Sequence, residues 1–183
     1  MSAEPTVALL CHPESAAGAV RRVTARVRRS PQGALAVAFV IDGDIARLRV
    51  PEPRPPRFAE RLWEHTCCEV FVARKGAAAY HEFNLSPSGE WTAWAFSGYR
   101  EREGPDATGL EPHVVVRTSP DTLELDATIR LDLVSAEHAR APLALGLSAV
   151  IEHADGSLSY WALRHPPGRP DFHHTDAFAL EIA

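Results

Sequence analysis

The stretch from Leu62 to Arg100 concentrates side chains that can bind a ligand or perform acid–base chemistry. It contains three tryptophans, two tyrosines and four carboxylates. Aromatic faces are apolar and carboxylates accept paired hydrogen bonds, so together they suit a polyhydroxylated molecule such as a sugar. The stretch therefore predicts a ligand-binding surface. The alternative is that the same groups only stabilise a sheet through cross-strand contacts.

The alternation of side chains along two expected strands places these groups on one surface. If residues 80–86 form a strand, Phe83 and Leu85 face the core. The opposite face, which is presented to solvent or to a ligand, then carries Tyr80, Glu82, Asn84 and Ser86. The preceding run, treated in the same way, presents Trp63, His65, Cys67, Glu69 and Phe71. If the strands pair, Glu69 and Glu82 lie close together, with Trp63 or Trp91 beside them.

Two carboxylates can also divide acid and base roles, which leaves open a hydrolase acting on a glycoside or related ester through Glu69 and Glu82. The chain has no GxSxG, HExxH, P-loop or paired-glycine motif. We therefore expect a non-catalytic domain that binds a small polar ligand. A module that binds another protein through a strand edge or an aromatic patch is a further alternative.

Two later segments add to this cluster. Residues 159–167 lead from aromatic side chains into a His-Pro turn, and residues 170–176 open the last expected strand. The second segment supplies four competent zinc ligands, Asp171, His173, His174 and Asp176. Their spacing matches no metal-site template, and Asp42 with Asp44 provides too few oxygen atoms for calcium. We expect neither a metal nor another cofactor.

The elements that must position these groups are short strands. Proline and glycine interrupt the chain at short intervals and leave runs rich in β-branched and aromatic residues. The expected strands cover residues 7–10, 23–29, 35–42, 62–73, 80–86, 91–96, 113–117, 123–130, 145–152, 158–163 and 177–182. Helix is expected only within 13–25 and within 131–139, the second capped by Asp132. The proline-rich segment 51–56 is a loop.

These runs predict one all-β domain spanning residues 1–183. Its expected architecture is a two-sheet antiparallel β-sandwich, jelly-roll or immunoglobulin-like, with one or two short helices. A closed lipocalin-type barrel is the alternative. With 45% hydrophobic and 23% charged residues, the composition is that of a globular chain with a packed core.

Charge and the terminal sequence restrict the partners. A formal net charge of −5 offers no basic surface for a phosphate backbone, so no nucleic acid is expected. No apolar stretch is long enough to span a membrane. The N-terminus lacks the pattern of a signal peptide, and the three cysteines form no CxxC pair. We expect a cytoplasmic protein with a small-molecule ligand, and its oligomeric state stays open.

Three segments carry a family resemblance. They are LWEHTCCEVFV (62–72), YHEFNLSPSGEWTAWAFSGYR (80–100) and SYWALRHPPGRPDFHHTDAFALEI (159–182). As a set they resemble bacterial DOMON-like domain proteins. These are related to carbohydrate-binding module family nine and, more distantly, to the haem-binding DOMON domains.

The resemblance implies a β-sandwich with a sugar ligand held against one sheet. Tryptophans would stack on the sugar, and carboxylate, amide and guanidinium groups would contact its hydroxyls. Haem-binding relatives use a methionine and a histidine, but the only methionine here is Met1. A haem site with two histidine ligands remains an alternative. The ligand-binding residues expected in total are Trp63, Glu69, Tyr80, Glu82, Asn84, Trp91, Trp161, Arg164 and His165.

Overall fold

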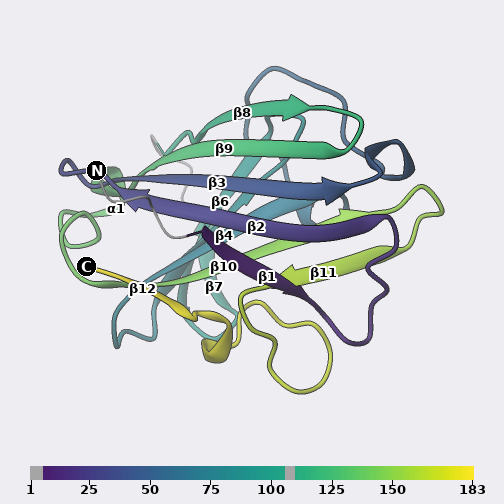
Figure 1. The fold of residues 1–183 in the computed structure, drawn as a ribbon. Helices are drawn as coiled ribbons and strands as arrows, with labels where there is room; N and C mark the ends of the chain where they lie inside the picture. The colour runs from purple at the N-terminus through teal and green to yellow at the C-terminus, as the bar shows by residue number, and fades with distance from the viewer. Residues whose placement is uncertain (1–5, 106–109) are drawn as a thin grey trace.

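Antiparallel strands make up most of the computed structural model, which describes residues 6–105 and 110–183 (Figure 1). The strands are β1 (Thr6–Cys11), β2 (Val20–Arg29), β3 (Ala34–Gly43), β4 (Cys67–Arg74), β5 (Tyr80–Leu85), β6 (Trp91–Gly98), β7 (Glu101–Pro105), β8 (His113–Thr118), β9 (Thr122–Arg130), β10 (Leu143–Glu152), β11 (Leu158–Ala162) and β12 (Leu180–Ile182). Helical segments are short: α1 (Leu131–Val134) and the 3-10 turns η1 (Ile45–Arg47), η2 (Leu62–Glu64) and η3 (Thr175–Ala177).

The strands form two layers joined through one shared strand. The front layer in Figure 1 contains β8, β9, β3 and β2, and the rear layer contains β7, β6, β5, β4, β10 and β11, with β12 paired to β10. Strand β1 pairs with β2 of the first layer and with β11 of the second. All pairings between these strands are antiparallel, so the prediction of an antiparallel all-β fold is confirmed.

The main core lies between the two layers and follows the alternation of the strands. In β3 every second residue is buried, and Phe39 meets the core from the front layer. Val70 of β4 and Phe83 of β5 reach the same core from the rear layer. Leu123 and Leu125 on β9 also point inward, as the alternation of that segment predicts.

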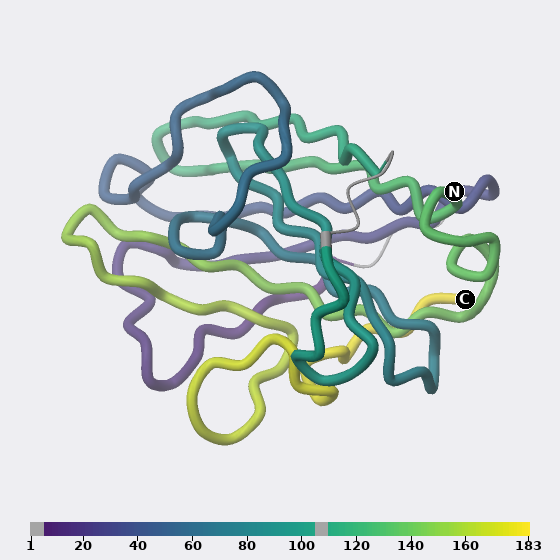
Figure 2. Tube along the Cα trace, turned by 180° about the vertical axis from the view of Figure 1, so that it is seen from behind, coloured from purple at the N-terminus to yellow at the C-terminus, as the bar shows by residue number. Residues whose placement is uncertain are grey.

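The outer face of the rear layer is buried as well. A second apolar cluster there combines residues of β4, β5 and β6 with Phe172 from the segment after β11. The cluster contains Phe71, Ala73, Tyr80, Trp94, Phe96, Val150, Ala162 and Phe172. In Figure 2 this C-terminal segment lies beside the turn between β6 and β7. The face expected to be open to solvent or ligand is therefore partly covered by the chain itself.

The two helix predictions were largely wrong. Within residues 13–25 the chain makes turns and then enters β2 at Val20, because the strand pairs with β1 and β3 and buries Val20, Val23 and Ala25 in the main core. Within 131–139 only one helical turn forms, α1. Asp132 does not cap it; its carboxylate accepts hydrogen bonds from Arg130 at 2.8 and 2.6 Å.

Strand boundaries differ from the sequence expectation in three places. The strand expected over 62–73 begins at Cys67, since residues 62–64 form the turn η2. The strand expected over 177–182 is reduced to β12, because residues 175–177 form η3. Strand β7 was not expected, since its sequence EREGP has none of the β-branched or aromatic residues typical of strands.

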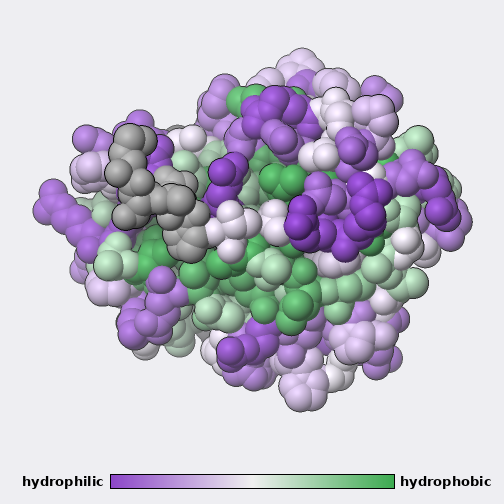
Figure 3. Space-filling model, in the orientation of Figure 1, coloured by the Kyte–Doolittle hydropathy of each residue, from purple (hydrophilic) through white to green (hydrophobic). Residues whose placement is uncertain are grey.

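The distribution of apolar and hydrophilic side chains on the surface follows the strand pattern. Figure 3, which views the front layer, shows apolar side chains across its middle with hydrophilic groups above and below. The outward residues of β3 are small or half-buried, which accounts for part of this band. Within the described ranges, no helix has the length and apolar character needed to cross a membrane.

A pair of leucines tests the position of the core. Leu125 is 1% exposed between the layers, whereas Leu133 on α1 is 49% exposed. Leu125→Ala should lower the free energy of unfolding by about 2–5 kcal/mol in urea denaturation. Leu133→Ala should change it by no more than about 0.5 kcal/mol. Equal losses at the two positions would contradict a core between the sheets.

Candidate functional site

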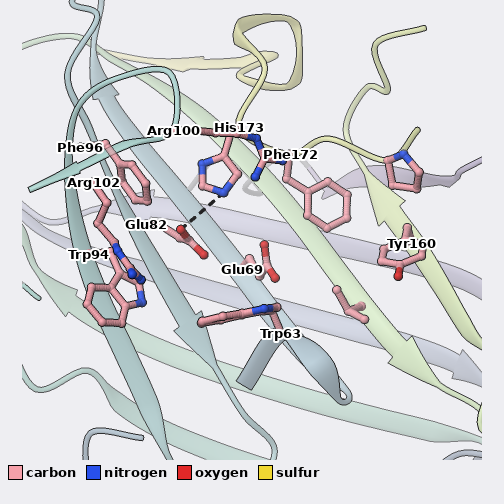
Figure 4. A pocket seen from close by; sticks show the side chains of 12 residues that line it. Trp63, Glu69, Glu82, Trp94, Phe96, Arg100, Arg102, Tyr160, Phe172 and His173 are labelled. Carbon is pink, nitrogen blue, oxygen red and sulfur yellow. Dashed lines mark ion pairs between the residues drawn. The ribbon is translucent and has the colours of Figure 1, made fainter. Parts of the chain in front are cut away.

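A pocket of about 720 Å³ opens on the outer face of the rear layer (Figure 4). It mixes carboxylates, guanidinium groups and aromatic rings from strands β4 to β7, from η2 and from the C-terminal segment. Its lining residues are Trp63, Glu69, Glu82, Trp94, Phe96, Arg100, Arg102, Val150, Tyr160, Pro170, Phe172 and His173.

Two glutamates on neighbouring strands form the floor. Glu69 of β4 is paired with Asn84 of β5, so Glu82 lies diagonally opposite Glu69 on the same face. Such diagonal neighbours have Cα atoms about 7–8 Å apart, within reach of long side chains. Only 3% of Glu69 and 6% of Glu82 is exposed. The alternation of the two runs correctly predicted that these carboxyls share a face.

Burial raises the pKa of both carboxyl groups. For Glu69 the pKa lies well above its usual range, because burial and the nearby charge of Glu82 both disfavour ionisation. For Glu82, burial also raises the pKa, but a hydrogen bond from the Asn84 amide and the charges of Arg100 and Arg102 oppose the rise. Glu69 therefore keeps its proton to higher pH than an ordinary glutamate and can act as a hydrogen-bond donor.

Asn84 fixes the position of the Glu82 carboxylate through a hydrogen bond. Its amide nitrogen donates to Oε1 of Glu82 and to Oγ1 of Thr92, both at 2.8 Å. The side-chain oxygen of Asn84 is buried and has no partner in the described chain. Because Asn84 is completely buried and does not line the pocket, it acts on a ligand only by orienting Glu82.

Two tryptophans provide flat surfaces around the carboxylates. Trp63 is the central residue of η2, and Trp94 of β6 is paired directly opposite Glu82. In Figure 4, Trp63 and His173 lie on opposite sides of the two glutamates. The indole N–H of Trp94 is buried without an acceptor among the residues described.

The C-terminal segment is attached to the β6–β7 turn through Asp171. One carboxylate oxygen of Asp171 accepts hydrogen bonds from the Arg100 guanidinium at 2.8 Å and from the backbone N–H of His173 at 3.1 Å. The Tyr99 hydroxyl donates to the other oxygen. These bonds lower the pKa of Asp171 against the opposing effect of burial.

His173 projects from this segment towards Glu82. Its Nδ1 lies 2.7 Å from the Tyr80 hydroxyl, and its Nε2 lies 3.7 Å from Oε2 of Glu82. The Tyr80 oxygen accepts the backbone N–H of Arg100, so its own hydrogen is available to Nδ1, which leaves the imidazole proton on Nε2. Burial and the charge of Arg100 lower the pKa of His173 to about 4. The ring is therefore neutral at neutral pH.

Two strained arginines adjoin the pocket. Apart from glycine, only Arg61 and Arg100 have positive φ in the described ranges, at 62° and 57°. This conformation costs an L-residue roughly 1–2 kcal/mol. Arg61 immediately precedes η2, which carries Trp63, and Arg100 itself lines the pocket. Strain is therefore located where the chain must turn to place pocket side chains.

Several residues predicted for the site lie together and others lie elsewhere. Trp63, Glu69 and Glu82 line the pocket, and Tyr80 orients His173 from behind it. Five further predicted residues do not line this pocket: Asn84, which orients Glu82, and Trp91, Trp161, Arg164 and His165, which lie elsewhere.

The placement of those four has simple reasons. Trp91 and Trp161 are 4% and 5% exposed in the main core, because their positions in β6 and β11 point towards the front layer. Arg164 is exposed in the segment after β11. His165 lies with Nε2 2.8 Å from the carbonyl oxygen of Leu10, near β1.

Some pocket residues were missed by sequence reasoning. Trp94 and Phe96 could have been found by extending the alternation of β5 to β6, because Glu82 pairs with Trp94 and Tyr80 with Phe96. Arg102 lies on β7, which has no strand signal. The positions of Phe172 and His173 depend on how the C-terminal segment folds back, which local patterns do not report.

The four competent metal ligands of this segment have other contacts. Asp171 and His173 are bonded as described above, and the side chain of His174 accepts from the backbone N–H of Asp176 at 3.2 Å. Across residues 6–105 and 110–183, no group of three or more histidine, cysteine or acidic side chains is arranged to hold a metal ion.

Comparison with known proteins gives a likeness of fold. No family model matches the sequence, and no curated protein resembles it significantly. The structure is similar to that of a candidate carbohydrate-binding protein from Bacteroides uniformis, with 13% identity, a TM-score of 0.62, and coverage of 95% of this chain and 84% of the other. It is also similar to a family 9 carbohydrate-binding module from Caldicellulosiruptor kristjanssonii in complex with cellotriose. That match has 10% identity, a TM-score of 0.56, and coverage of 90% and 75%.

The raised pKa of Glu69 predicts a pH-dependent stability. A carboxyl whose pKa is higher in the folded than in the unfolded state stabilises the fold at low pH, and this contribution is lost as pH rises through the folded pKa. Glu69→Gln should therefore gain stability relative to the unmodified protein between pH 4 and pH 8 in urea denaturation. Glu60→Gln, at an exposed position, is the matched control and should show no such gain. Parallel pH profiles for the protein and Glu69→Gln would refute the shift.

The conformation of Arg100 predicts an unusual order of stability. Arg100→Ala and Arg100→Gly both lose the pair with Asp171, but only glycine adopts positive φ without a steric cost. Arg100→Gly should be more stable than Arg100→Ala by about 1 kcal/mol in denaturant unfolding. The same two substitutions at Arg117, within strand β8, should show the reverse order. Alanine equal to or better than glycine at position 100 would argue against strain there.

Proposed function

We propose that this protein binds a sugar or sugar derivative in the pocket over Glu69 and Glu82 without transforming it. The observation that carries the proposal is the combination of flat tryptophan surfaces with a buried donor and acceptor at the pocket floor. The volume of about 720 Å³ lies within the range of about 300–1,000 Å³ that is usual for small-molecule sites.

The polar groups match the needs of a polyol. Glu82, held by Asn84, presents carboxylate oxygens that accept hydroxyl hydrogens. Glu69, while protonated, can donate to a hydroxyl oxygen. Trp63 offers a ring face to the C–H surface of a sugar. Burial makes each of these hydrogen bonds worth more, since a ligand without hydroxyls would leave the groups unpaired.

Fold likeness supports the same conclusion. The two similar structures bear names that refer to carbohydrate binding, and one was determined with cellotriose. Together with the sequence resemblance to DOMON-like domain proteins, this favours a sugar over other polar ligands. We also propose that this chain is a member of the DOMON-like domain proteins.

Binding without turnover fits the geometry better than hydrolysis. In glycosidases the two carboxyls flank the scissile bond, one on each side. Here Glu69 and Glu82 project from adjacent strands of one sheet face and form one wall of the pocket.

Calorimetric titration with glucose and cellotriose tests the proposal. Trp63→Ala should weaken binding of the tighter ligand by about tenfold or more, equivalent to about 1.4 kcal/mol, because stacking on that ring is lost. Glu82→Gln should weaken it to a similar degree, since the amide supplies one oxygen in place of two.

A control variant and two further measurements make the result decisive. Glu60→Gln is the charge-matched control for Glu82→Gln and should bind normally, and thermal unfolding should show that Trp63→Ala remains folded. Product analysis after incubation with cellotriose should show no cleavage. If neither ligand binds, or if Trp63→Ala and Glu82→Gln bind as the unmodified protein does, the proposed site is wrong.

A further inference from the structure

Arg102 is a cation at the edge of the pocket, and no carboxylate of the described residues pairs with it. Its guanidinium lies over the ring of Trp94, 4.3 Å from the ring centroid. Arg100, by contrast, is paired with Asp171 at 2.8 Å. Within the described part of the chain, Arg102 makes no ion pair, although it lies near enough to Glu82 to lower the pKa of that group.

The strand geometry keeps Arg102 in this position. Arg102 of β7 is paired with Phe96 of β6, and both line the pocket. A guanidinium that stacks face-on against an indole keeps its N–H groups at the edge of the plane, where they remain free to bond. With its Cζ over the Trp94 ring and its side chain exposed, Arg102 can present N–H groups to a planar or tetrahedral anion.

The charges around the pocket leave Arg102 without excess negative charge beside it, because Arg100 is already paired with Asp171. The pocket lining carries two guanidinium groups, Arg100 and Arg102, and two carboxyls, Glu69 and Glu82. The carboxyls are close and buried, so each hinders ionisation of the other, and the pair retains a proton over part of the pH range. While that proton is present, Asp171 and Glu82 offset the two guanidinium groups, so no excess negative charge opposes an anion bound at Arg102.

The charge of Arg102 lies apart from the carboxyl groups of Glu69 and Glu82. The two carboxyls are buried at the bottom of the pocket, whereas the side chain of Arg102 is exposed. Figure 4 shows Arg102 beside Trp94, with Glu69 on the far side of Glu82. A ligand whose hydroxyls meet the carboxyls can therefore direct an anionic substituent towards Arg102.

We propose that the preferred ligand is an anionic monosaccharide, with its carboxylate or phosphate bound by Arg102 and its ring lying against Trp63. This inference rests on the proposed sugar-binding function and specifies its ligand class. A uronate and a sugar phosphate share the required chemistry, since each presents two oxygen atoms to a guanidinium.

Titrations with glucose, glucuronate and glucose 6-phosphate in low-salt buffer test the inference. At least one anionic sugar should bind about tenfold or more tightly than glucose, because a bidentate charged hydrogen bond is added. This advantage should shrink in 0.5 M NaCl, since salt screens an exposed ion pair. The anionic sugar with the larger advantage identifies the source of the charge.

Variants of Arg102 test whether this side chain causes the higher affinity for anionic sugars. In Arg102→Gln the ratio of anionic to neutral affinity should fall to about one, and Arg102→Lys should keep part of it because the charge remains. Arg26→Gln is the matched control: Arg26 is exposed on β2 of the opposite layer and lies outside the pocket, so the ratio should be preserved.

The possible failures are distinguishable. If glucose binds as tightly as both anionic sugars, or if the advantage survives in Arg102→Gln, the inference about Arg102 is overturned while sugar binding stands. If none of the three sugars binds, the proposed function fails and the inference fails with it.

Discussion

Burial of two carboxyl groups side by side on one sheet face is the constraint on which the rest of this structure depends. Removing a carboxylate from water costs several kcal/mol unless it is protonated or paired. Glu69 meets this cost by holding its proton, and Glu82 meets it through Asn84 and the positive field of Arg100 and Arg102. The sheet face that carries these two carboxyl groups therefore needs polar side chains around them.

The covering segment supplies those surroundings. Residues after β11 cross the outer face of the rear layer, where Phe172 joins the second apolar cluster and His173 faces Glu82. Asp171 ties this segment to the β6–β7 turn through Arg100. The same contacts that close the apolar cluster therefore bring a neutral imidazole and a guanidinium to the edge of the pocket.

Backbone strain is confined to the places where this assembly demands it. Arg61 and Arg100 adopt a conformation that L-residues avoid, and each stands at a turn that places pocket side chains. Their guanidinium groups form compensating bonds to Glu64 and Asp171.

Sequence alone determined the all-β character, most strand positions and the shared face of Glu69 and Glu82, because side-chain alternation in a strand is a local property with a period of two. The same rule, extended one strand further, selects Trp94 in place of Trp91. Tertiary structure alone decided the remainder of the site. Arg102 enters it through a strand with no sequence signal, and Phe172 and His173 enter through a segment that folds back over the sheet. The contacts of this C-terminal segment join residues 71 and 93 positions apart, and no local pattern encodes which distant surfaces will pack together.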